Sequence, residues 1–144
     1  MKINHILVPY DGSEPSRRAF QFALDLAKKY NSPIIAVTCI LENYYEPYTE
    51  TPEAQRAALH SQNIAASKLI SMLEFQAKES NVEFKGLVLK TTSIVDALLS
   101  YANSNAIDII IMGCRGLGGF KKLLLGSVAS GISQYSKCPV LIIK

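Results

Sequence analysis

The stretch IDIIIMGCRG, residues 107–116, decides the fold because it joins a buried-strand pattern to a glycine-rich turn. Residues 107–112 are apolar apart from Asp108, and such a short apolar run is typical of a strand buried on both faces of a parallel sheet. The run GCRGLGG at residues 113–119 follows at once. We therefore expect a buried strand whose carboxyl end leads directly into a glycine-rich loop.

Outward from this stretch, further apolar runs alternate with helical patterns. The predicted strands are residues 3–8, 34–40, 82–89, 107–112 and 139–143; the predicted helices start near residues 13–16, 54, 92–93 and 127 and end near residues 30, 80, 101 and 135. This alternation predicts an α/β fold, an open five-stranded parallel sheet with right-handed crossover helices on both faces. The sequence shows no linker or repeat, so one domain covering residues 1–144 is expected.

A long loop and a long helix are predicted between the second and third strands. Residues 42–52 are acidic, rich in tyrosine and interrupted by proline, which is typical of a loop. The tyrosines of this loop are Tyr44, Tyr45 and Tyr48. Three interpretations stay open for them: a lid, a surface that binds a partner, or loop residues without a specific function. Residues 54–80 are rich in helix formers, and the apolar stripe predicted for this helix is Ala58, Ala65, Leu69, Met72 and Leu73.

Composition argues against several classes of protein. The chain has 144 residues, of which 49% are hydrophobic and 19% charged, so it has enough apolar side chains for a continuous core. The net charge is +3 without a dense basic block, which argues against a protein that binds nucleic acid. No apolar run approaches the roughly 20 residues that span a membrane, and no signal-peptide pattern opens the chain. A soluble, cytoplasmic protein is expected.

The spacing of cysteine and histidine argues against a metal site. Cys39, Cys114 and Cys138 form no CxxC pair, and His5 and His60 are isolated from them in the sequence. An odd number of cysteines also suits a reducing compartment better than a disulfide scaffold. We expect the cysteines to be small buried hydrophobic residues and expect no zinc site.

The late glycines have a spacing that suits a phosphate. Two residues separate Gly113 from Gly116, nine separate Gly116 from Gly126, and Ser127 follows. Glycine lets the backbone approach a phosphate, and the free amides at the start of a helix attract anions. Lys121 and Lys122 add positive charge inside the loop, while the simpler alternative is that the glycines only turn the chain.

Two better-known phosphate loops do not match. The glycine spacing of a Walker A loop occurs at Gly126 and Gly131, but the Lys-Ser/Thr pair that should follow is missing. The first predicted strand is not followed by GxGxxG. The sequence therefore predicts neither a P-loop NTPase nor a typical dinucleotide site.

Four segments together resemble the universal stress protein family of the UspA type. They are VPYDGS at residues 8–13 with Ser16 and Ala19, DIIIMG at residues 108–113, the glycine spacing that ends at Ser127, and CPVLII at residues 138–143. The likeness spans the whole chain. The glycine spacing is similar to that of the ATP-binding branch of the family.

The resemblance implies a Rossmann-like fold, similar to that of the adenine nucleotide alpha hydrolases, with strand order 3-2-1-4-5. It also implies ATP, or another adenine nucleotide, between the first and fourth strands, with Mg²⁺ or Mn²⁺ held mainly by phosphate oxygens and no metal-ligating residue. Cys39 stands where the family usually has valine against adenine. The candidate binding residues are Pro9, Tyr10, Asp11, Cys39, Met112, Gly113, Arg115, Gly116, Gly119, Gly126, Ser127, Val128 and Ala129.

Two aspartates have competing interpretations. Asp11 precedes Gly12 and is either a turn-forming residue or a contact to the ligand. Asp108 begins a predicted strand, away from the carboxyl end where ligands bind such sheets, so we expect a structural rather than a catalytic role.

Three functions remain open. The main prediction is an ATP-binding sensor or molecular switch in the stress response with at most slow hydrolysis, because the loop suits an anion but no general base is evident. The first alternative is a nucleotide-free dimeric interaction module of the same fold. The second is a true ATPase or nucleotidyl-transfer enzyme, and the partner protein of the switch is unknown.

The last strand predicts a homodimer. Val140, Leu141, Ile142 and Ile143 are apolar on both faces, yet the last strand is expected at a sheet edge. An exposed apolar edge promotes aggregation unless something covers it, and a twofold dimer is the commonest cover. Relatives in the family that the chain resembles pair through this strand.

Overall fold

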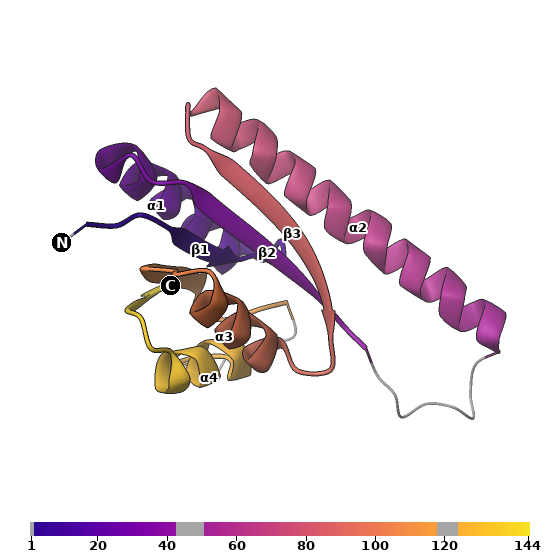
Figure 1. Cartoon of the computed structure of the whole chain (residues 1–144). Coiled ribbons are helices and arrows are strands. Elements are labelled where there is room, and N and C mark those ends of the chain that lie inside the picture. The colour runs from indigo at the N-terminus through magenta and orange to yellow at the C-terminus, as the bar shows by residue number, and fades with distance from the viewer. Residues whose placement is uncertain (1, 43–50, 118–123) are drawn as a thin grey trace.

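The computed structural model describes residues 2–42, 51–117 and 124–144, which form alternating strands and helices (Figure 1). The strands are β1 (Ile6–Pro9), β2 (Ile34–Leu41), β3 (Phe84–Thr91), β4 (Ile109–Gly113) and β5 (Val140–Ile143). The helices are α1 (Glu14–Tyr30), α2 (Pro52–Glu79), α3 (Ile94–Ser104) and α4 (Ser127–Tyr135). Some residues discussed above lie outside the described residues: Tyr44, Tyr45 and Tyr48 of the loop after β2, and Gly119, Lys121 and Lys122 of the loop after β4.

The predicted sheet is confirmed. All the strand pairs are parallel and the strand order is β3-β2-β1-β4-β5, as the resemblance implied. Ile6 of β1 aligns with Ile34 of β2 on one side and with Ile109 of β4 on the other. The strand order therefore reverses between β1 and β4, which is where open α/β sheets bind their ligands.

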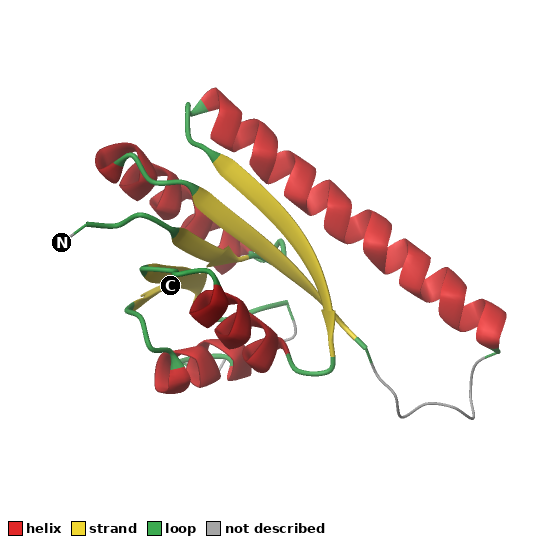
Figure 2. Cartoon of the chain, viewed as in Figure 1, coloured by secondary structure: helices red, strands yellow, loops and turns green. Residues whose placement is uncertain are grey.

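Alternate strand residues face opposite layers of helix. Ile6 and Val8 of β1 belong to the core cluster beneath α1 and α2, whereas Leu7 belongs to the cluster beneath α3 and α4. Figure 2 shows the two layers, with the long α2 lying along the sheet on one side and α3 and α4 on the other. Burial on both faces explains why the central strands β1 and β4 are continuous apolar runs.

Three strands, β1, β4 and β3, differ from prediction by two or more residues at a boundary. β1 starts at Ile6 because the amides of Asn4 and His5 donate to the carboxylate of Asp108, at 2.7 and 2.9 Å, instead of joining the sheet. β4 accordingly starts at Ile109, after this aspartate. The structural role expected for Asp108 is confirmed, since it ties the start of the chain to the amino-terminal edge of the sheet.

The third of these strands is β3, which spans Phe84–Thr91 rather than residues 82–89. The amide of Val82 donates to Ala77 at 2.9 Å, so this residue completes the exit from α2. At the far end, the amide of Glu42 donates to Thr91 at 2.7 Å, which extends the pairing of β2 with β3.

The apolar stripe predicted for α2 was partly wrong. Ala58, Ala65 and Met72 are exposed. The face that packs on the sheet contains buried Ala66, Leu73 and Ala77, with half-buried Leu69 and Ile70 beside them. The error has two causes: Ala65 and Met72 directly precede buried Ala66 and Leu73 and so lie to the side of the face that packs on the sheet, and the first half of this 28-residue helix contributes no buried residue.

The beginning of α2 also differs from prediction. The helix starts at Pro52, because the side chain of Thr51 caps it by accepting from the amide of Ala54 at 3.1 Å.

In the part of the chain that the structure describes, none of the helices is both long enough and apolar enough to cross a membrane.

Candidate functional site

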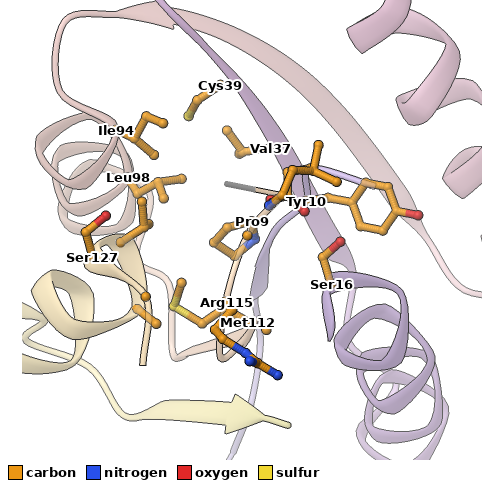
Figure 3. Close-up of a pocket in the computed structure, with 17 residues that line it drawn as sticks. Pro9, Tyr10, Ser16, Val37, Cys39, Ile94, Leu98, Met112, Arg115 and Ser127 are labelled. Atoms are coloured by element: carbon orange, nitrogen blue, oxygen red, sulfur yellow. The ribbon is translucent and has the colours of Figure 1, made fainter. Parts of the chain in front are cut away.

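A cavity of about 570 Å³ opens at the carboxyl ends of β1, β2 and β4, where the strand order reverses. Its walls come from these strand ends, from α3 and from the start of α4. Figure 3 shows its two ends, with Cys39, Ile94 and Val37 at one and Arg115 at the other. The two ends differ in chemistry.

The first end is apolar. Val37 and Cys39 are two residues apart on β2 and therefore face the same side of the sheet, and Ile94 and Leu98 are one helical turn apart on α3. Burial raises the pKa of the Cys39 thiol from 9.0 to about 11, so this side chain is a neutral thiol at physiological pH. An apolar slot with neutral walls suits a flat ring such as a nucleobase.

The second end consists of backbone and polar groups. Gly116 and Arg115 follow β4, and Gly126 precedes α4. The amide of Gly126 donates to the carbonyl of Cys114 at 2.7 Å, so the start of α4 is held against the end of β4. This hydrogen bond holds Gly126, which precedes α4, close to Gly116, which follows β4.

At the start of α4, the first backbone amides receive no cap from the side chain of the N-cap residue. Gly126 is the N-cap residue and offers no side chain, and the first turn contains no acidic residue. Within the described ranges, no side chain caps the amides of Ser127, Val128 and Ala129. These amides carry the positive end of the helix dipole, which favours an anion at this end of the cavity.

Close packing explains two of the glycines. A Cβ on Gly116 would lie 2.7 Å from Oδ2 of Asp11, and a Cβ on Gly113 would lie 2.8 Å from the backbone of Pro15. Gly116 therefore leaves room for the Asp11 carboxylate, whereas Gly113 lets β4 pack against the start of α1. A Cβ on Gly126 would meet nothing closer than 3.4 Å.

Asp11 connects the loops that follow β1 and β4. Its Oδ1 accepts from the amide of Ser13 at 2.9 Å, and its Oδ2 accepts from the amide of Leu117 at 3.2 Å. Asp11 therefore has the turn-forming role considered for it, and it also accepts a hydrogen bond from the loop after β4.

All the candidate residues from the sequence except Gly119 line this one cavity, and Gly119 lies outside the described residues. Sequence reasoning missed Ser16, Val37, Ile94, Leu98 and Leu117, which also line it. One of these had a usable signal, because Val37 shares the face of Cys39 by strand alternation.

Carboxylates do not gather here. Among the described residues, no three His, Cys, Asp or Glu side chains lie together in a way that would hold a metal ion. Of the described residues that line the cavity, Asp11 carries a carboxylate, and both of its oxygens accept backbone hydrogen bonds. A divalent ion at this site would therefore depend on the oxygens of a bound ligand.

Comparison with known proteins identifies the family. Residues 2–144 match the sequence model of the Universal stress protein family. The chain belongs to this family. It is similar to the universal stress protein YxiE of Bacillus subtilis, with 29% identity over 155 residues that cover 98% of this chain and 99% of the relative.

Solved structures share the fold. The universal stress protein UspA from Lactobacillus plantarum superposes with a TM-score of 0.84 at 19% identity, covering 100% of this chain and 99% of that one. A family member from Arabidopsis thaliana with AMP bound has a TM-score of 0.71 at 20% identity, covering 98% and 91%. One from Archaeoglobus fulgidus in complex with dAMP has a TM-score of 0.65 at 20% identity, covering 100% of both chains. At these identities the likeness establishes the fold.

Proposed function

We propose that this universal stress protein binds an adenine nucleotide, with ATP as the expected form, in the cavity between β1 and β4. The nucleotide state then acts as a sensor or switch in the stress response. The base would occupy the apolar end near Cys39 and Ile94, and the phosphates would occupy the end formed by Gly116, Gly126 and Ser127. The AMP and dAMP complexes of family members support an adenine nucleotide as the class of ligand.

One observation carries the proposal: the uncapped start of α4 lies in the same cavity as the apolar slot. A nucleotide is a flat, largely apolar ring joined to an anion, and the two ends of the cavity match these two parts. A site for an apolar ligand alone would not need exposed amides, and a site for a free anion would not need the slot.

Mg²⁺ or Mn²⁺ would enter together with the triphosphate. Its charge would screen the phosphates from one another, and its ligands would be phosphate oxygens and water because the described residues of the cavity include no carboxylate cluster. The chain's own contribution is to hold the phosphates with backbone amides and with the positive charge of Arg115.

The site favours binding over fast hydrolysis. Hydrolysis requires a group that orients the attacking water, usually a carboxylate or glutamine. The lining residue suited to this role is Asp11, and its two oxygens already accept from Ser13 and Leu117. Slow turnover is therefore expected.

Calorimetry with the purified protein tests the binding. ATP, AMP and cyclic AMP are titrated with and without Mg²⁺, and nucleotide released on heat denaturation is identified by chromatography. We expect an adenine nucleotide to bind and to raise the melting temperature.

The variant Gly116→Val should abolish binding, because the valine side chain displaces the Asp11 carboxylate. The matched control is Ser133→Ala, on the exposed side of α4. Absence of binding to the wild-type protein would favour a nucleotide-free interaction module.

We also propose that the protein forms a homodimer through β5. The two edge strands of the sheet differ, because β3 carries exposed Lys85 and Lys90, whereas Val140, Leu141, Ile142 and Ile143 of β5 are all apolar and half-buried. Lysine on an edge strand discourages pairing with another sheet, so β5 is the edge suited to a second copy. Sedimentation should show a dimer that Ile142→Lys dissociates and that Val88→Lys, on the other edge, leaves intact. A monomeric wild-type protein would contradict this.

A further inference from the structure

The phosphate end of the cavity and the edge strand β5 belong to one continuous segment of the chain. The helix α4 begins at Ser127, which lines the cavity, and ends at Tyr135. Residues 136–139 then lead directly to β5, which begins at Val140 and is an edge of the sheet. We call residues 126–143, yellow in Figure 1, the α4–β5 unit.

Two consecutive hydrogen bonds join the start of α4 to the end of β5. The amide of Gly126 donates to the carbonyl of Cys114 at 2.7 Å, and the amide of Cys114 donates to the carbonyl of Ile143 at 2.8 Å. Cys114 itself is buried. One buried residue at the end of β4 therefore holds both the N-cap residue of α4 and the last residue of β5.

A turn joins the other ends of α4 and β5. The amide of Ser136 donates to the carbonyl of Ile132 at 2.9 Å, which continues the bonding of α4. The hydroxyl of Ser136 donates to the carbonyl of Cys138 at 2.8 Å and accepts from the amide of Cys138 at 3.2 Å. The helix and the strand are therefore held to one another at both ends.

The α4–β5 unit is weakly buried for a segment that is so well connected. In α4, the buried residues are two of nine, Ala129 and Ile132, and β5 has no buried residue. The neighbouring strand β4, by contrast, has four buried residues of five. Segments with few buried side chains open locally at a low cost in free energy. A ligand that holds this unit in place therefore has a local opening equilibrium on which to act.

We propose that a nucleotide in the cavity orders the α4–β5 unit and thereby strengthens the pairing of β5 with a second copy of the chain. This regulation rests on the proposed function, because it requires phosphates at the start of α4 and a dimer through β5. Phosphates on the first amides of α4 would hold the beginning of the unit, and a second copy would hold its end. Whichever binds first orders the unit, so the other binds more tightly. By linkage, the two gains in affinity are equal.

Sedimentation and calorimetry measure the two gains. Saturating AMP, or ATP with Mg²⁺, should lower the dissociation constant of the dimer about tenfold. The monomeric variant Ile142→Lys should bind the same nucleotide more weakly than the wild-type dimer by about the same factor. Val88→Lys, on the other edge of the sheet, adds the same charge and should keep the wild-type affinity. Circular dichroism checks that both variants are folded.

Hydrogen exchange tests the ordering itself, without a dimer. In the monomeric Ile142→Lys variant, nucleotide should slow the exchange of amides in residues 136–144 at least about fivefold. These residues do not line the cavity, so their protection does not come from contact with the ligand. Exchange in β3, the other edge strand, should stay unchanged.

Two serines provide matched variants. Ser136→Ala removes the hydroxyl that bonds in the turn between α4 and β5, whereas Ser133→Ala removes one that donates to the carbonyl of Ser130 at 3.0 Å, inside α4. Neither serine lines the cavity or belongs to β5. Ser136→Ala should reduce the effect of nucleotide on the dimer about threefold, and Ser133→Ala should keep the wild-type effect.

The outcomes separate this proposal from the proposed function. A protein that binds nucleotide and dimerises, with neither dissociation constant depending on the other event, would overturn the coupling and leave the proposed function standing. Unchanged exchange in residues 136–144, or a wild-type effect of nucleotide on the dimer of Ser136→Ala, would show that the α4–β5 unit does not carry the coupling. Absence of nucleotide binding, or of a dimer, would overturn both proposals together.

Discussion

The loops after β1 and β4 lie at the same end of the sheet, but they leave the helices that follow them in opposite states. After β1, the side chain of Ser13 accepts from the amide of Ser16 at 3.3 Å, and Glu14 lies in the first turn of α1. After β4, Gly126 offers α4 no side chain, and the first turn of α4 carries no acidic residue. The first loop caps its own helix, whereas no side chain among the described residues of the second loop caps α4.

The other described helices follow the pattern of α1. Thr51 caps α2, with Glu53 in the first turn, and Ser93 caps α3, with Asp96 in the first turn. Each of these helices meets the positive end of its dipole with the chain's own oxygens. Only α4 starts without such a cap among the described helices, and its start lines the cavity. An uncapped helix start beside a cavity is a place where an anionic ligand can bind.

The largest effect is expected from giving α4 a cap like that of α1. Gly126 has φ −72° and ψ 169°, a backbone conformation open to any residue, and a Cβ there would meet nothing closer than 3.4 Å. Gly126→Asp should keep or slightly raise the unfolding free energy, by up to about 1 kcal/mol. Nucleotide affinity should fall about 100-fold, because the new carboxylate occupies the amides and repels the phosphates. Calorimetry and thermal unfolding measure the two effects.

The control for this variant is Gly126→Asn, which supplies a neutral cap. It should lose less affinity than the aspartate variant, since it competes for the amides without repelling the phosphates. Equal affinity of wild type and Gly126→Asp would show that the start of α4 does not hold the ligand.

The next effect separates a glycine required for packing from one required for a ligand. Gly113→Ala should reduce the unfolding free energy by about 1 to 3 kcal/mol, because its Cβ would lie 2.8 Å from the backbone of Pro15 in α1. Urea unfolding in the absence of nucleotide measures this loss. A variant as stable as wild type would mean that β4 and α1 have room to separate.

A smaller effect is expected from removing the cap of α1. Ser13→Ala should cost about 1 kcal/mol of unfolding free energy, because the amide of Ser16 loses its acceptor. Nucleotide affinity should change little, since Ser13 does not line the cavity and its hydroxyl donates to the carbonyl of Arg115 only at the long distance of 3.5 Å. Urea unfolding and calorimetry test both parts, and a large loss of affinity would show that the two loops do not act separately.

The sequence was sufficient for the sheet and for most of the cavity lining. Strands buried on both faces are continuous apolar runs, so residues 34–40 and 107–112 were recognisable without tertiary information. The candidate residues at strand ends were found because loops at the carboxyl ends of parallel strands meet at one edge of the sheet.

What the sequence did not predict depended on packing between distant segments. The first half of α2 has the composition of an amphipathic helix, but the position of the helix on the sheet determines which face packs and how much of it does, so the exposure of Ala58 and Ala65 did not follow from composition. Ile94 and Leu98 were assigned to the apolar face of α3, but their position in the cavity follows from the packing of α3 against β2, β3 and α4. The bond from Asp11 to Leu117 joins residues 106 apart in the chain.

The smallest effect concerns the apolar end of the cavity, which is formed by β2 and α3 rather than by the loops after β1 and β4. Burial raises the pKa of Cys39 from 9.0 to about 11, so the folded state favours the neutral thiol more than the unfolded state does. A raised folded pKa contributes stability that is complete below pH 9 and is lost as the pH rises through about 11. Cys39→Val removes the ionising group, so its unfolding free energy should fall less than that of wild type across this window. Urea unfolding of both proteins at several pH values isolates Cys39, because every other titrating group is common to the two. The loss should be small because the thiol is only partly buried, and parallel pH curves would show that the slot does not exclude water from Cys39.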